Sequence, residues 1–192
     1  MRIEWKEIPK EETIFKIASK YPGVSPKAFE AYLKMMWLSA QTERVMDTHF
    51  NEWGLSRGRF MLLMMLYGQC HLGFSANGEP GPAALSPSEL ASQLDVTRGN
   101  MTGLIDGLER EGWIRRESQP DDRRGLLIVL TDEGSARLEK LLPIHFQRMG
   151  RFLSKLSAGE AEGMLVGVQR LLSGLNGVRE ELEAVVKEKA KE

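Results

Sequence analysis

Three polar side chains of the kinds that read nucleic-acid bases, Arg98, Asn100 and Thr102, occur within one short stretch of the sequence. Arginine can pair with guanine, asparagine can pair with adenine, and threonine can bond a base or touch a thymine methyl group. The apolar residues of this stretch recur at helical spacing, namely Met101, Leu104, Ile105 and Leu108. The periodicity predicts a helix, capped by Thr97 and ended by Gly112, whose apolar side is buried and whose polar side is exposed.

A pair of arginines, Arg123 and Arg124, lies in a segment of turn-forming residues, 118–125. This segment separates two β-rich runs, 113–117 and 126–130, so the pattern predicts a β-hairpin with a long loop. Arginine at the tip of such a loop can enter the minor groove of DNA, where the potential of a narrow groove is most negative.

A second, shorter helix is predicted directly before the polar stretch. Ser86 and Glu89 have the spacing of a capping box, and Pro87 suits the first helical position. Asp95 and Val96 then form the turn into the next helix. Helix, turn, helix and hairpin together are typical of a winged helix-turn-helix, whose parts match the two grooves of duplex DNA.

Phosphate contact is a second expected role for the start of the polar helix. Thr97 is first of all a helix cap, but helix N-termini also attract anions. Gly99 and Gly103 each lower helix stability by about 1 kcal/mol relative to alanine. Close approach of the helix backbone to a phosphate chain would explain them, and so would a local packing requirement.

Segment 85–134 resembles the DNA-binding part of the MarR family of bacterial transcriptional regulators. The matching sequence motifs are TRGNMTGLIDGLEREGWI in the polar helix and DDRRGLLIVLTDEG in the hairpin. The resemblance extends more loosely over 26–175. It implies a homodimer that binds a pseudo-palindromic site in double-stranded DNA, usually as a repressor, with Arg124 in the minor groove and Asp122 orienting an arginine.

The expected fold is mainly α with a small β-hairpin wing, comprising a winged helix-turn-helix lobe and a helical dimerisation lobe. The sequence is divided into an N-terminal arm and long dimerisation helix (1–55), a DNA-binding lobe (56–134) with a loop insertion (71–84), and C-terminal dimerisation helices with a charged tail (135–192). The expected helices outside the DNA-binding segment are 26–53, 57–70, 132–156 with a bend at Pro143, and 157–175. The tail, 179–192, is expected to be a frayed helix or disordered.

Composition limits the other classes of function. The 192 residues carry a formal net charge of −1, so a non-specific nucleic-acid coat is not expected. No apolar run approaches the ~20 residues of a membrane span, and the protein is expected to be cytoplasmic without membrane partners. No phosphate loop, nucleophile elbow or metal motif is present, so neither an enzyme nor a bound cofactor is expected.

Aromatic and sulfur-containing residues on two predicted helices form a candidate effector site. Members of the resembled family bind phenolic or other lipophilic ligands, so a small-molecule effector is a possible partner. The candidate lining residues are Trp37, Phe50, Phe60, Met64 and Tyr67. Core packing is the ordinary role of such residues, and both roles can hold at once.

Two alternative functions remain open from the sequence. Cys70, the single cysteine, lies next to His71, which could lower its pKa and make the chain a thiol-based redox sensor. Alternatively, the winged helix binds a protein and not DNA, because the charges of 97–124 are balanced. Arg98 and the arginine pair of the hairpin favour DNA binding over protein binding.

Overall fold

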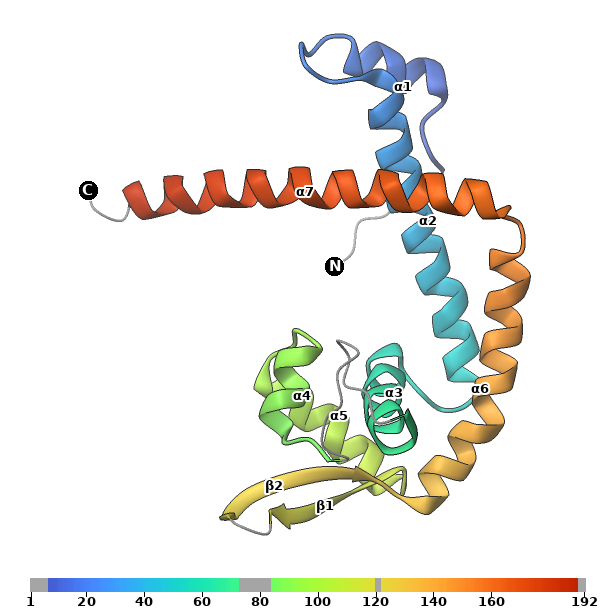
Figure 1. Ribbon diagram of the computed structural model, residues 1–192, viewed down its shortest axis with the longest axis vertical. Coiled ribbons are helices and arrows are strands. Elements are labelled where there is room, and N and C mark those ends of the chain that lie inside the picture. Colours follow the sequence, from blue (N-terminus) through green and yellow to red (C-terminus); the bar gives the residue numbers. More distant parts are fainter. Residues whose placement is uncertain (1–6, 73–83, 120–121, 190–192) are drawn as a thin grey trace. The chain divides into compact units, whose positions relative to one another are not determined.

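The computed structural model describes residues 7–72, 84–119 and 122–189; for 70–72, 119 and 122–124 it describes the backbone alone. These residues form the helices α1 (Glu11–Ala18), α2 (Pro26–Asn51), α3 (Arg57–Leu72), α4 (Pro87–Gln93), α5 (Arg98–Arg110), α6 (Asp132–Leu153) and α7 (Ala158–Lys189), and the strands β1 (Ile114–Gln119) and β2 (Asp122–Leu130) (Figure 1). The chain divides into two compact units, Met1–Leu141 and Leu142–Glu192.

Helix α1 was not predicted, because its eight residues follow no strong start signal. It buries Ile14 and Ala18 and packs against α2. An ion-pair bridge reinforces this contact: Lys27 Nζ lies 2.9 Å from Glu11 and 2.7 Å from Glu30. The N-terminal arm is therefore attached to the long helix by an apolar contact and a charged one.

Helices α2 and α3 begin where the sequence indicated. The side chain of Ser25 accepts a hydrogen bond from the amide of Ala28, as expected of an N-cap. Helix α3 runs on to Leu72, so the predicted insertion at 71–84 begins later than expected, and 73–83 lie outside the described residues. Its central residues are fully buried: Leu62, Leu63 and Leu66.

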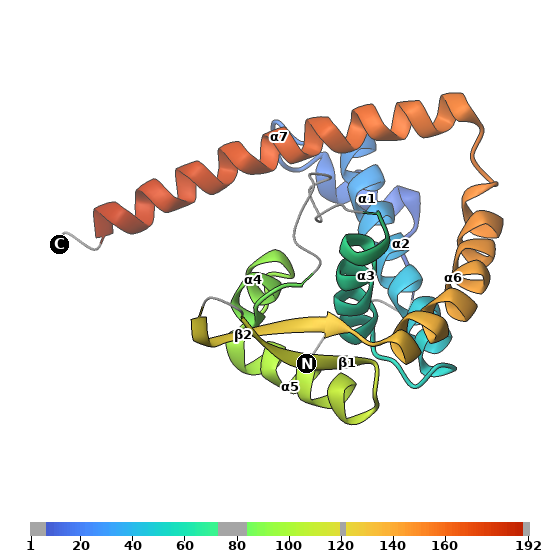
Figure 2. The ribbon, with the colours of Figure 1, turned by 60° about the horizontal axis from the view of Figure 1, so that its bottom comes forward.

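The helix-turn-helix and the hairpin pack on α3 (Figure 2). Helix α4 contacts α5, strand β1 contacts α5, and β2 contacts both α3 and α4. Leu85 and Ile128 exchange two backbone hydrogen bonds, which join the start of α4 to the hairpin. The predicted long hairpin loop at 118–125 is wrong in extent, because strand pairing continues to Gln119 and Asp122 after an irregularity at Ser118.

Helix α6 begins in the first unit and ends in the second. It ends at Leu153, slightly before the predicted end, and it includes Pro143. Helix α7 is much longer than predicted: it continues past residue 175 without a break to Lys189, and none of its residues is buried in the single chain. The charged tail is therefore helical as far as Lys189, with an apolar side that the single chain leaves exposed.

Candidate nucleic-acid interface

Caps fix the starts of α4 and α5, and the turn between the two helices contains one unusual backbone conformation. Ser86 and Glu89 form the predicted capping box, with amide-to-side-chain distances of 2.8 and 3.2 Å. Asp95 has a φ of +50°, in the left-handed region. Thr97 accepts a hydrogen bond from the amide of Asn100 at 3.3 Å, which confirms the second predicted cap. The turn therefore fixes where α5 begins.

Helix α5 has the two faces that its periodicity predicted. Met101, Ile105 and Leu108 are buried, whereas the polar residues Arg98, Asn100 and Thr102 are all exposed. The Thr102 hydroxyl donates to the carbonyl of Arg98 at 2.9 Å, which leaves its lone pairs and its methyl group available to a ligand. The exposed face thus presents a cation, an amide and a methyl-bearing hydroxyl.

Two of the three glycines in α5 lie on this exposed face. A Cβ added at Gly99 or Gly103 would meet no atom within 4 Å. The packing of the described residues therefore does not explain these glycines, and the backbone of α5 is accessible to a ligand there. Gly107 differs, because a Cβ at that position would overlap the guanidinium group of Arg59.

The arginines of β1 have different partners. Arg115 pairs with Glu117 on its own strand, with Nη2 2.6 Å from the carboxylate. Arg116 reaches α5, where it pairs with Asp106 at 2.5 Å and also with Glu109. The hydrogen bond to Asp106 is the main cause that raises the pKa of Arg116 above its usual value. Arg116 thus ties the hairpin to α5 and balances two carboxylates there.

The predictions for the hairpin tip concern side chains that the structure does not describe. Asp122, Arg123 and Arg124 have backbone positions in β2, and Asp122 is the strand partner of Gln119. The expected minor-groove role of the two arginines, and the orienting role of Asp122, remain predictions. The structure likewise does not describe the Cys70 side chain, so the alternative function as a redox sensor remains untested.

The candidate effector residues divide into core and half-buried positions. Phe50 and Phe60 are buried, and their rings stack with centroids 4.3 Å apart. Trp37, Met64 and Tyr67 are half-buried, and the Trp37 Nε1 is buried without a hydrogen-bond partner among the described residues. Phe50 and Phe60 thus pack as core residues where α2 meets α3.

Sequence reasoning missed the residues that hold the other end of α5. Arg59 of α3 binds Glu111 at 2.8 Å, and Arg137 of α6 donates to the carbonyl of Glu111 at 3.0 Å. Their partners are 52 and 26 positions away along the chain. Gly107 was the one local indication of the contact between α3 and α5, because the absence of a Cβ leaves room for the Arg59 side chain to cross α5.

Two further properties limit the chemistry of the site. Among the side chains that the structure describes, no three His, Cys, Asp or Glu residues are grouped to bind a metal ion. No helix within the described part of the chain is long and apolar enough to cross a bilayer. A helix-turn-helix whose second helix has an exposed polar face, beside a two-stranded hairpin, defines the class of winged helix-turn-helix proteins.

Comparison with known proteins gives the family. The MarR family model matches residues 81–126. The HTH-type transcriptional repressor YetL of Bacillus subtilis is 34% identical over 160 residues, which cover 83% of this chain and 89% of YetL. The regulator PecS of Dickeya dadantii is 31% identical over 123 residues, covering 64% of this chain and 68% of PecS. The chain belongs to the MarR family, and it is a transcriptional regulator rather than an enzyme.

Solved structures show the same fold. AbsC, a MarR family regulator from Streptomyces coelicolor, matches with a TM-score of 0.63 and 21% identity, covering 77% of this chain and 93% of AbsC. MepR of S. aureus in complex with DNA matches with a TM-score of 0.59 and 24% identity, covering 75% of this chain and 96% of MepR. The mainly helical fold with a hairpin wing is therefore confirmed.

Proposed function

We propose that the protein represses transcription by binding a pseudo-palindromic operator as a homodimer. The observation that carries the proposal is the exposed face of α5, where Arg98, Asn100 and Thr102 lie beside two glycines with open space around them. Side chains of these types can read base edges in the major groove, and glycine allows the backbone to approach closely. YetL is named as a repressor, and the MepR structure contains DNA, which agrees with this assignment.

The hairpin supplies the second part of the proposed DNA contact. Arg123 and Arg124 are proposed to reach the minor groove, with Asp122 orienting one of them, because the two strands extend to this position. Thr97 is proposed to contact a phosphate in addition to capping α5, since its backbone lies at an exposed helix N-terminus. These contacts would position the protein and the α5 side chains would select the sequence.

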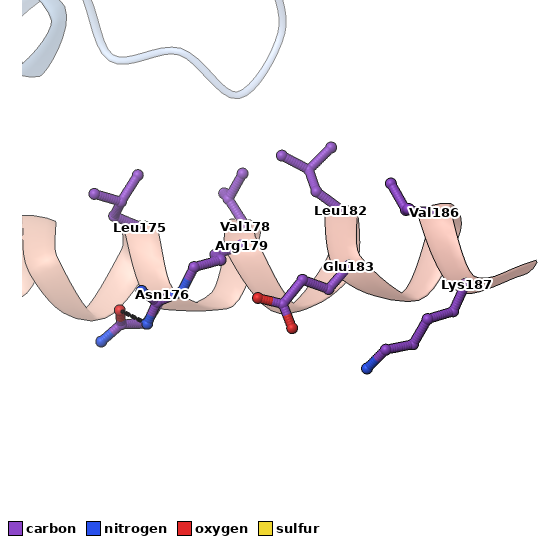
Figure 3. A pocket seen from close by; sticks show the side chains of 8 residues that line it. All are labelled: Leu175, Asn176, Val178, Arg179, Leu182, Glu183, Val186 and Lys187. Atoms are coloured by element: carbon purple, nitrogen blue, oxygen red, sulfur yellow. Dashed lines mark hydrogen bonds between the residues drawn. The ribbon is translucent and has the colours of Figure 1, made fainter. Parts of the chain in front are cut away.

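The proposed homodimer is supported by the apolar side of α7. Apolar residues recur along the helix at alternating intervals of four and three: Met164, Val168, Leu171, Leu175, Val178, Leu182 and Val185. This 3.5-residue repeat is the pattern of a helix that pairs with another helix. Figure 3 shows the distal part, where Leu175, Val178, Leu182 and Val186 project from one side of α7. A second copy of the chain is the proposed cover, because a twofold dimer would present two copies of α5 to a palindrome.

A small lipophilic or phenolic effector is proposed to modulate DNA binding. The proposed lining is the set Trp37, Phe50, Phe60, Met64 and Tyr67, of which three members are half-buried. The indole nitrogen of Trp37, which has no hydrogen-bond partner in the described part of the chain, could donate to a phenolate or carboxylate. The ligand would change DNA affinity by the difference between its affinities for the two states of the dimer.

Selection of genomic DNA fragments with the purified protein, at about 0.15 M salt, tests the proposal. We expect an enriched pseudo-palindrome with half-sites about ten base pairs apart. Asn100→Ala should weaken binding to that operator more than to scrambled DNA, whereas Arg124→Ala should weaken both and reduce the salt slope. Recovery of no preferred sequence by a folded dimer would refute the operator-binding function.

A further inference from the structure

The C-terminal end of α5 is held by the first turns of α6 through hydrogen bonds to three consecutive carbonyl groups. Nη1 of Arg137 donates to the carbonyl of Glu111 at 3.0 Å. The Thr131 hydroxyl lies 2.7 Å from the carbonyl of Gly112 and 3.1 Å from that of Trp113. These carbonyls belong to the C-cap residue of α5 and to the two residues after it, so the start of α6 is bonded to the turn in which α5 ends.

The Arg137 side chain is fixed by two further contacts. Its guanidinium carbon lies 5.1 Å from the centre of the Trp113 ring, a cation–π contact, and the same group pairs with Glu133 one turn earlier. Trp113 is buried at the base of the hairpin. Arg137 therefore binds the end of α5, the base of the hairpin and its own helix at once, and its charge also suits the negative end of the α5 dipole.

The backbone of α6 passes very close to the hairpin base at Gly134. A Cβ at this position would overlap the carbonyl oxygen of Trp113 and lie 2.9 Å from its carbonyl carbon. The amide of Gly134 also donates to the Thr131 hydroxyl at 2.9 Å. Such a contact leaves little room for α6 to shift against the hairpin, so the junction between α5 and α6 is stiff.

We infer that Arg137 is a positioning residue that fixes the direction of α5 relative to the first turns of α6. The inference rests on the proposed function, because it concerns how Arg98 and Asn100 are presented to DNA. Helix α5 has 13 residues, so these side chains lie at its opposite end, roughly 18 Å from the junction at 1.5 Å per residue. Over that length a tilt of about 5° moves the N-terminal end by about 1.6 Å, which exceeds the tolerance of a hydrogen bond.

Arg137→Met tests the inference, because methionine keeps an apolar stem and removes the charge and all the donors. Lys140→Met is the matched control, since Lys140 is an exposed cation one turn further along the same helix. Affinity is measured at 25 °C for the selected operator duplex and for a scrambled duplex of the same length. We expect Arg137→Met to lower operator affinity about tenfold and to leave scrambled-duplex affinity and its salt slope within twofold, and Lys140→Met to change neither.

Circular dichroism at the same temperature establishes that each variant is folded. If Arg137→Met is not folded, Arg137→Lys gives the measurement, because it keeps a cation but loses the planar fork, and we expect about a threefold loss on the operator. Unchanged operator affinity, or an equal loss on both duplexes, would overturn the positioning role. A wild-type protein with no preference between duplexes would instead refute the proposed function on which the inference rests.

Discussion

Replacing Gly103 by alanine is expected to make the protein more stable and a weaker binder of its operator. Gly103 lies inside α5, and an added Cβ would meet no atom of the described residues outside its own helix turn within 4 Å, so these residues do not resist the substitution. Alanine is favoured over glycine in a helix interior by about 1 kcal/mol. For a chain of this size that gain corresponds to a rise in Tm of about 2–4 °C. The added methyl group would at the same time stand between the α5 backbone and the DNA.

Gly107→Ala is the matched variant in the same helix. It has the same intrinsic gain, but its Cβ would overlap the Arg59 guanidinium, whose Cζ lies only 2.8 Å away. The Arg59 guanidinium is the far end of a flexible side chain and can move away, so the main cost is the loss of its partly exposed ion pair with Glu111, about 0.2–1 kcal/mol. This cost offsets much of the helix gain, so Gly107→Ala should be less stable than Gly103→Ala by about 0.2–1 kcal/mol.

Urea unfolding followed by circular dichroism measures the stabilities, and titration of the operator duplex measures affinity. Gly103→Ala should raise the urea midpoint and weaken operator binding, whereas Gly107→Ala should raise the midpoint less or leave it unchanged. A Gly107→Ala protein at least as stable as Gly103→Ala would refute the packing argument. Unchanged operator affinity of Gly103→Ala would refute the close approach of α5 to DNA.

Three further predictions follow from single contacts. Ser86→Ala removes the capping box of α4 and should lower the unfolding free energy by about 1 kcal/mol; a urea midpoint equal to that of wild type would contradict this. Leu182→Asp should yield monomers in sedimentation analysis, because it places a charge on the apolar side of α7. Asn176 is exposed on the other side of the helix (Figure 3), so the control Asn176→Asp should remain dimeric. The pKa of Glu30 is lowered chiefly by its hydrogen bond from Lys27 and also by that from Lys34. The stability from Glu30 is therefore present at neutral pH and lost as the pH falls below the ordinary carboxyl value of about 4.3. Hydrogen exchange of α1 should consequently rise more steeply with acid in wild type than in Glu30→Gln; equal acid dependence would exclude this role.

Local signals explain most of what could be predicted. Ser25, Ser86 and Thr97 were identified as caps, and each accepts the expected backbone hydrogen bond. Capping depends on residues three positions apart, so the sequence contains all the information that it needs. The buried face of α5 was predictable for the same reason, because helical periodicity groups Met101, Ile105 and Leu108 on one side of the helix.

Two errors came from giving local composition too much weight. The last predicted helix ended at residue 175 and the charged tail 179–192 was treated separately, although Val178 and Leu182 continue the apolar repeat and α7 includes both. The hairpin loop was drawn too long because turn-forming residues are common in 118–125, whereas strand pairing extends to Asp122. Helix α1 was missed because its formation depends on burying Ile14 and Ala18 against α2.

The fold class, the helix starts and the polar residues of α5 could be inferred from the sequence alone, since each depends on neighbours within one or two helical turns. The partners that hold α5 in place became known only from the packing of the elements. Arg116 could have faced water, but it pairs with Asp106 and Glu109 of α5, and Arg59 and Arg137 meet at Glu111 from two other helices. Such pairings depend on how separate elements pack together, and this packing cannot be predicted from the spacing of residues along one element.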